Sequence, residues 1–301
     1  MEDRHNYITS LPKDTPSSIQ SLNSEVSFFA VYDGHSGDSC ADFLSKNLFK
    51  HVLVEESKAD NLTVSTLLSS DDRIKSGFMK TDAAFEKAGE GLDDSGTTAV
   101  TTFVKKIGDK VEVICANTGD SRCVLFNEGK TEPMSYDHKP TNQLERDRIH
   151  KAGSFVEFSR VNGSLAVSRA FGDLSYKKSL KVPPEEQAVT ALPDIKRVQI
   201  SVDKSKRKDF TFLVLACDGI WDVMSNEDAT KFVRDRLVKQ REGKYIPSSA
   251  TTDSEFDDAV QPKSYKNGEY DLGAICEDML DYCVKCLDSK DNVSVIIVLF
   301  E

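Results

Sequence analysis

Four aspartates stand at the ends of apolar runs, each beside residues typical of a turn. They are Asp33 after residues 28–32, Asp120 after 113–117, Asp218 after 212–217, and Asp291 before the final run 293–300. Rigid strands that each end in an acidic loop can bring their carboxylates together at one edge of a sheet. Hard anionic oxygens gathered in one place repel one another unless cations lie among them. The pattern therefore predicts a divalent-metal centre, with His35 two positions from one candidate ligand.

The elements that would position these residues follow from hydrophobic periodicity. Strands are expected at 26–32, 97–105, 110–116, 122–126, 198–202, 210–216 and 293–300, and helices at 39–54, 71–87, 142–152, 226–239 and about 272–287. The dipeptide at Asn162 and Gly163 predicts a hairpin between strands at 154–158 and 164–167. Neighbouring strands with short links favour antiparallel sheets packed face to face, with helices outside, over a doubly wound parallel sheet.

Composition excludes several classes of protein. The chain has 301 residues, of which 39% are hydrophobic, and this content argues against disorder. Its net charge of -11 argues against nucleic acid as a partner. No apolar run approaches the roughly 18 residues of a membrane span, and the first residues lack the features of a signal peptide. Seven cysteines without a disulfide framework indicate a reducing compartment, so we expect a cytoplasmic or nuclear location.

Two of these cysteines, Cys283 and Cys286, form a C-x-x-C pair that could carry redox or zinc chemistry. The pair lies within a helical stripe of apolar residues, and no second pair accompanies it. Core packing is therefore the favoured interpretation.

Eight short motifs follow one another along the chain. They are MED at 1–3, DGH at 33–35, SGTTA at 95–99, ANTGDSR at 116–122, DHKP at 137–140, RVNGSLAVSRA at 160–170, DGIWD at 218–222 and DN at 291–292. In this order and spacing, the motifs resemble those of the metal-dependent serine/threonine protein phosphatases of type 2C, the PPM family. The resemblance covers nearly the whole chain, except a polar stretch at about 240–269.

The resemblance implies an α+β fold: a β-sandwich of two antiparallel sheets flanked by pairs of α-helices. It also implies two Mg²⁺ or Mn²⁺ ions at one end of the sandwich. By this resemblance Asp33 would bridge both ions, Asp218 and Asp291 would complete the first, and Glu2 and the Gly34 carbonyl would hold the second. Asp3 would orient waters, and Asp120, Asp218 and Asp222 resemble a weaker third metal site.

The activity that the resemblance implies is hydrolysis of phosphoserine and phosphothreonine in proteins. A metal-bridging hydroxide would attack phosphorus, and His35 would protonate the departing oxygen as general acid. The expected partner is a phosphorylated protein, and the expected state is a monomer. One alternative is an inactive pseudophosphatase that serves as a scaffold, which the loss of a ligand aspartate would signal. Another is a nucleotide phosphodiesterase, which would need a basic groove.

The expected organisation is a single catalytic domain over 1–301, with a flap at about 140–190 and a mobile insertion at about 240–269. Arg146, Arg148 and Lys151 in the flap can be read as a solvated helix face. Family members usually carry an arginine a few residues before the MED string, where it grips the substrate phosphate. Because this sequence starts at that string, we expect a truncated or unassigned start, and the phosphate-binding residue stays open.

Overall fold

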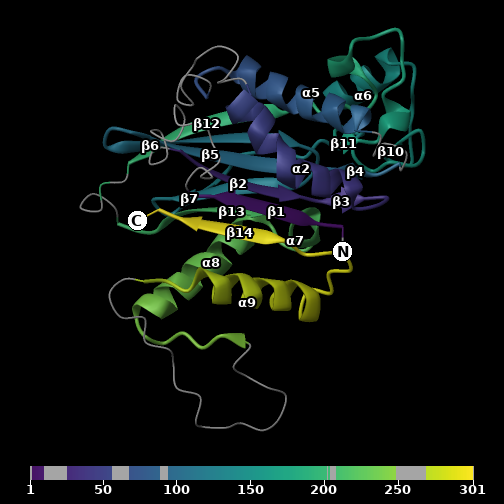
Figure 1. The fold of residues 1–301 in the computed structure, drawn as a ribbon. Coiled ribbons are helices and arrows are strands. Elements are labelled where there is room, and N and C mark those ends of the chain that lie inside the picture. The colour runs from purple at the N-terminus through teal and green to yellow at the C-terminus, as the bar shows by residue number, and fades with distance from the viewer. Residues whose placement is uncertain are drawn as a thin grey trace.

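Two antiparallel sheets form the centre of the molecule (Figure 1). The computed structural model describes residues 2–9, 26–55, 68–88, 94–201, 203, 208–248 and 269–300. The first sheet has the order β1 (Arg4–Ile8), β2 (Val26–Tyr32), β5 (Ala99–Ile107), β6 (Lys110–Thr118) and β12 (Asp194–Ser201). The second has the order β14 (Val295–Leu299), β13 (Thr211–Ala216), β7 (Arg122–Asn127) and β8 (Lys130–Pro133).

Apolar side chains on alternating strand positions build three layers of core. In β13, Leu213 and Leu215 face the first sheet, while Phe212 and Val214 face the helices α8 (Asn226–Arg241) and α9 (Leu272–Lys285). The outer face of the first sheet is covered in the same way by α2 (Ser39–Phe49) and α5 (Asp71–Lys87). Figure 1 shows one helix pair on each side of the sandwich. This arrangement confirms the predicted α+β sandwich flanked by helix pairs.

The strand β1 was absent from the sequence-based expectation. Its residues are mostly polar and alternate between half-buried and exposed, as an edge strand allows. It pairs with β2 from Arg4 opposite Tyr32 to Ile8 opposite Phe28. The Arg4 guanidinium also bonds to Asp38 and Asp42 at the start of α2. These contacts hold the beginning of the chain beside the end of β2.

The predicted helix at 39–54 is two elements. The α-helix α2 ends at Phe49, and a π-helical segment, η1 (Lys50–Glu55), continues it. Gly77 of α5 lies against this segment, since an added Cβ would come within 2.8 Å of the Val52 Cα. None of the helices in the described parts of the chain is long and apolar enough to span a bilayer.

Three short strands form a small sheet at one edge of the sandwich. They are β11 (Phe171–Gly172), β4 (Gly96–Thr97) and β3 (Gly34–His35), in that order. In β3, Gly34 and His35 directly follow the Asp33 that ends β2. The small sheet thereby connects the main sandwich to the flap.

The flap contains α6 (Gln143–Lys151), β9 (Val156–Glu157), β10 (Arg160–Val161), and the 3₁₀ turns η3 (Leu174–Tyr176) and η4 (Pro184–Glu186). It has a small apolar core of its own, which includes Ile149 and Val161. The predicted hairpin around Asn162 and Gly163 is wrong in register. The turn that joins β9 to β10 lies at Phe158 and Ser159, and Asn162–Gly163 forms a second turn closed by a bridge between Val161 and Leu165.

A buried ion cluster holds the flap together. The Glu145 carboxylate is 3% exposed and accepts bonds from Arg148 and Arg169. Arg148 also donates to the Gln187 carbonyl at 3.0 Å, so the expected solvated face is wrong for this residue. Burial raises the pKa of Glu145, but the hydrogen bond from Arg169 and the charge of Arg148 outweigh it and lower the pKa to about 2.

The start of the expected insertion at about 240–269 packs on the domain. Gln240 exchanges two hydrogen bonds with the backbone of Asp271, at 3.0 and 2.9 Å. The buried Tyr245 donates its hydroxyl to Asp278 at 2.8 Å, and Ser248 donates its backbone N–H to the same carboxylate at 2.7 Å. Residues 240–248 therefore belong to the second sheet's helical layer, and the rest of the expected insertion, 249–268, lies outside the described residues.

The C-x-x-C cysteines have unequal surroundings. Cys283 is fully buried in the core under α9, whereas Cys286 is exposed, and both are free thiols. Core packing therefore explains Cys283, as the sequence indicated, but not Cys286.

Glu145→Gln should lower the free energy of unfolding by about 3 kcal/mol at pH 7, because it leaves the largely buried Arg148 guanidinium without its anion and leaves Arg169 with Asp194 alone. The folded-state pKa of about 2 lies below the ordinary 4.5, so Glu145 stabilises the fold above pH 4.5. That stabilisation is lost as pH falls toward about 2. Urea unfolding of both proteins at pH 7 and at lower pH measures the difference.

The matched control is Glu186→Gln, whose carboxylate pairs with Lys151 on the surface and should cost less than about 1 kcal/mol. Equal effects of the two substitutions would contradict a structural role for the buried cluster.

Candidate active site

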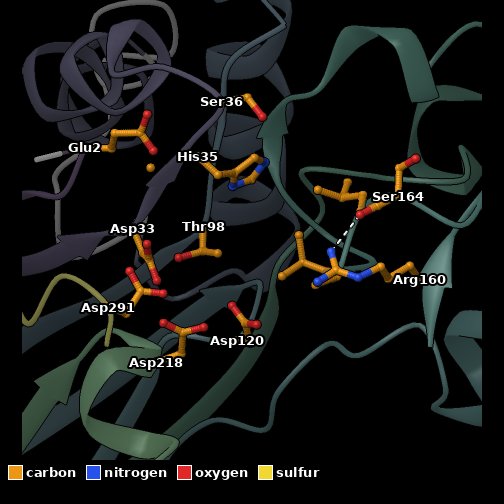
Figure 2. Close-up of a pocket in the computed structure, with 14 residues that line it drawn as sticks. Glu2, Asp33, His35, Ser36, Thr98, Asp120, Arg160, Ser164, Asp218 and Asp291 are labelled. Carbon is orange, nitrogen blue, oxygen red and sulfur yellow. Dashed lines mark hydrogen bonds between the residues drawn. The ribbon is translucent and has the colours of Figure 1, made fainter. Parts of the chain in front are cut away.

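A cavity of about 340 Å³ opens at the edge of the sandwich where the predicted metal ligands meet. Figure 2 shows the carboxylates of Asp33, Asp120, Asp218 and Asp291 on one side. The side chain of Arg160 reaches in from the flap on the other. The cavity thus has an acidic wall from the sandwich and a wall from the flap that carries a cation.

Three of the four aspartates form a tight group. Carboxylate oxygens of Asp33, Asp120 and Asp218 all lie within 4.8 Å of one another. Burial, followed by the charge of Asp218, raises the pKa of Asp33 to about 9. Burial and the charge of Asp120 raise the pKa of Asp218 to about 6. Each carboxyl therefore disfavours the charge of its neighbours, which a divalent cation among them would relieve.

The donor set fits a hard divalent cation. The charged groups of the acidic wall are carboxylates, and oxygen donors suit Mg²⁺ or Mn²⁺, whereas zinc and copper sites favour nitrogen and sulfur. Asp291 lies at the mouth of the acidic wall and is exposed. Asp33, Asp120, Asp218 and Asp291 are thus placed as the sequence predicted, although their coordination stays a prediction.

Strand ends and glycines bring the acidic wall together. Asp33 is held through its carbonyl, which accepts bonds from the Thr98 N–H at 2.9 Å and the Thr97 hydroxyl at 3.0 Å. Asp218 begins the short helix α7 (Asp218–Trp221) directly after β13. A Cβ at Gly219 would overlap the Asn292 carbonyl. Only glycine at this position allows α7 and the loop that carries Asp291 to approach so closely.

The beginning of the chain reaches the same cavity. Glu2 lines it, and its carboxylate accepts a bond from the Gly37 N–H at 2.9 Å. Gly34 also lines it, and a Cβ there would lie 2.5 Å from the Glu2 carbonyl oxygen. Asp3 is 5% exposed, lies behind the lining, and accepts a bond from the Ser294 hydroxyl at 2.7 Å. These positions suit Glu2 and Gly34 as ligands and Asp3 as a supporting residue.

The predicted third-metal group is only partly assembled. Asp120 and Asp218 are together, whereas Asp222 is exposed at the far end of α7 and acts on Asp218 through its charge. The ammonium of Lys139 bonds to the Asp120 carboxylate. Burial lowers the pKa of Lys139, but the charge of Asp120 outweighs burial and the net pKa is raised. Lys139 is thus a built-in counter-charge at this end of the cavity.

His35 stands beside the acidic wall and is paired with Asp173. Its Nε2 lies 2.7 Å from the Asp173 Oδ2. A Cβ at Gly96 would overlap both side chains, so the pair depends on glycine there. Burial lowers the pKa of His35, yet the hydrogen bond and charge of Asp173 outweigh it and the net pKa is raised. The pairing favours the protonated imidazole.

Asp173 is itself held from two sides. Its backbone has φ +48°, a left-handed conformation, and its N–H donates to the Ser95 carbonyl at 3.1 Å. Asp82 of α5 accepts bonds from the Gly172 N–H at 2.9 Å and from the Lys177 ammonium at 2.7 Å. The helix therefore fixes the turn that orients His35.

Three polar residues of this site were not assigned from the sequence: Lys139, Arg160 and Asp173. Lys139 belongs to the DHKP motif and Arg160 to the RVNGSLAVSRA motif. The motifs were identified in the sequence, but they do not reveal that these two side chains point toward the acidic wall. Asp173 is separated from His35 by 138 positions in sequence, and no pattern pointed to the contact.

Comparisons with known proteins agree with this architecture. A family profile for protein phosphatase 2C matches residues 1–268. A probable protein phosphatase 2C of Caenorhabditis elegans is 41% identical over 82% of this chain and 62% of its own length. Protein phosphatase 2C homolog 2 of Schizosaccharomyces pombe is 37% identical over 100% of this chain and 69% of its own length. The chain thus spans about two thirds of these relatives.

A solved structure shows the same fold. The crystal structure of a phosphatase from Toxoplasma gondii superposes with a TM-score of 0.70 at 25% identity, covering 99% of this chain and 88% of the other. The profile match, the similarity to relatives over most of the chain and the shared fold lead to one conclusion: this chain belongs to the protein phosphatase 2C family.

Proposed function

We propose that this chain hydrolyses phosphoserine and phosphothreonine in proteins, with Mg²⁺ or Mn²⁺ as cofactor. The observation that carries the proposal is the group formed by Asp33, Asp120 and Asp218, whose oxygens lie within 4.8 Å of one another in a cavity that Arg160 enters from the flap. Such a cavity suits a phosphate group, which needs cations on several sides. Family membership supports the same reaction class.

Two cations would be held by the residues placed on the acidic wall. Asp33 would contact both, Asp218 and Asp291 the first, and Glu2 with the Gly34 carbonyl the second, while a weaker third would lie near Asp120. When bound, the cations would lower the pKa of a water that attacks phosphorus and would offset the negative charge of the phosphate.

His35 would act as the general acid. A serine or threonine alkoxide is a poor leaving group, so a proton delivered to the departing oxygen lowers the barrier. Asp173 favours the protonated imidazole through a 2.7 Å contact at Nε2 and fixes the plane of the ring. Asp173 is thus a positioning residue that keeps His35 charged and oriented toward the cavity.

Arg160 is the candidate for the phosphate-binding residue that the sequence left open. Its Nη1 donates to the Ser164 carbonyl at 2.7 Å, which sets the direction of the guanidinium (Figure 2). The remaining N–H groups are geometrically suited to two phosphate oxygens at once. This residue belongs to the flap and lines the cavity opposite the acidic wall.

The alternative functions gain no support. A scaffold without activity would be signalled by a lost ligand, yet Asp33, Asp218 and Asp291 are all present and all line the cavity. A nucleotide phosphodiesterase would need a basic groove, and the described wall of the cavity is dominated by carboxylates.

Asp218→Asn should reduce Mn²⁺-dependent hydrolysis of a phosphoserine peptide by at least about 100-fold, because even residues behind metal ligands contribute 10–100-fold. Phosphate release and the melting temperature, measured in the same samples with Mn²⁺ or EDTA, test this. The matched control is Asp288→Asn, an exposed carboxylate near Asp291 that pairs with Lys290. Full activity of Asp218→Asn, or wild-type activity in EDTA, would overturn the proposed function.

His35→Gln should lower kcat for phosphoserine by about 100-fold and lower kcat for p-nitrophenyl phosphate much less, since p-nitrophenolate leaves without a proton. Steady-state kinetics on both substrates measures the ratio, with the exposed His150→Gln as control. Equal losses on both substrates would instead assign His35 a structural role.

Lys139→Met should tighten binding of Mn²⁺ and lower the melting temperature of the metal-free protein, because both effects follow from removing the counter-charge on Asp120. Titration calorimetry gives the affinity, and the fluorescence of Trp221, the single tryptophan, follows binding beside Asp218. Lys151→Met on the flap surface is the control. Unchanged or weaker affinity would show that Lys139 does not compete with the cation.

A further inference from the structure

The hairpin of β9 and β10 has an unusual turn. Glu157 pairs with Arg160, so only Phe158 and Ser159 connect the two strands. Both have positive φ, +49° and +62°. Two-residue hairpin turns with positive φ at both positions are the type that asparagine and glycine favour. This chain places an aromatic residue and a serine there instead.

A bulky residue in this conformation raises the free energy of the fold. The Cβ of an L-residue crowds the following carbonyl when φ is positive, and for a large side chain the conformation is a clear outlier. Strained residues of this kind gather at binding sites, where the surroundings make use of them. The turn therefore needs an explanation outside local preference.

Packing within the chain does not explain the residue. The Phe158 side chain is 84% exposed, and the nearby Phe155 is 50% exposed. A ring that was kept to stabilise the flap would be expected among Ile149, Val161 and the rest of the flap core, to which Phe158 does not belong. The ring instead faces solvent at the tip of the hairpin.

The second strand of the hairpin borders the active-site cavity. Arg160, two residues after Phe158, lines that cavity, and the loop at 164–167 that follows the hairpin lines it as well. An extended peptide advances about 3.3 Å per residue, so residues a few positions from a phosphorylated residue in the cavity can reach this hairpin. A macromolecular substrate would thus meet Phe158, whereas a small phosphate ester would not extend to it.

We propose that Phe158 is a specificity residue that packs against an apolar side chain of the phosphoprotein substrate, a few residues from the phosphorylated serine or threonine. The inference rests on the proposed function and adds to it a substrate class: phosphosites flanked by aliphatic or aromatic residues. Arg160 holds the phosphate, and Phe158 covers an apolar neighbour, so the hairpin contacts the substrate at two points. The exposed ring then loses its contact with water on substrate binding, which offsets the strain of the turn.

The test uses a series of phosphoserine peptides in which Leu or Ala stands in turn at each flanking position on either side. For the wild-type chain with Mn²⁺, at least one Leu peptide should exceed its Ala counterpart in kcat/KM by about tenfold, as expected for one well-packed apolar anchor. In Phe158→Asn this ratio should fall close to one. The loss on the Leu peptide should exceed any change on p-nitrophenyl phosphate, and the melting temperature should stay equal or rise, since asparagine suits positive φ.

The matched control is Ser159→Gly, which relaxes the same turn and keeps the ring, and should retain the Leu preference. An unchanged preference in Phe158→Asn, an equal loss on p-nitrophenyl phosphate, or a clear fall in melting temperature would overturn the role of Phe158 alone. Equal kcat/KM of the wild-type chain on every Leu peptide and its Ala counterpart would also overturn the role of Phe158. Absence of phosphate release from every peptide would overturn the proposed function, and this inference with it.

Discussion

Repulsion among closely spaced carboxylates is the constraint on which the rest of the structure depends. Burial raises the pKa of Asp33 and of Asp218; the charge of Asp218 adds to the effect at Asp33, and the charge of Asp120 adds to it at both. A flexible chain would separate such groups, so each is placed at the end of a strand whose faces are packed. Glycines at positions 34 and 219 allow neighbouring backbones to close in, and Lys139 offsets part of the charge. The same repulsion that destabilises the fold prepares the site for cations.

The flap is connected to this acidic wall by polar contacts that pass through His138. Its ring accepts a bond from the Gly119 N–H at 3.0 Å, next to Asp120. Its carbonyl accepts bonds from the N–H and hydroxyl of Ser168, whose hydroxyl lies 2.8 Å from Glu145. The ion cluster around Glu145 therefore supports both walls of the cavity. A substitution in this cluster should therefore shift Asp120 as well as the flap.

Sequence patterns predicted the features that follow from hydrophobic periodicity and from the residues at strand ends. The helix at 71–87, the alternating strands and the aspartates at their ends lie where expected, because burial imposes regular spacing. Features that depend on distant contacts or on local strain were missed. The edge strand β1 has no apolar alternation, Arg148 donates to the Gln187 carbonyl of another segment, and the turn at Phe158 contradicts the usual residue preference. The pairing of His35 with Asp173 exists only in the folded chain.

The most direct test of the account is a titration of Mn²⁺ into EDTA-treated wild-type protein, with phosphate release from a phosphoserine peptide and the melting temperature followed together. If the carboxylate group of Asp33, Asp120 and Asp218 is the metal centre, both signals should rise from their metal-free values over the same range of Mn²⁺ concentration. Phosphate release in the absence of any divalent cation, or activity that rises with no change in melting temperature, would contradict the account.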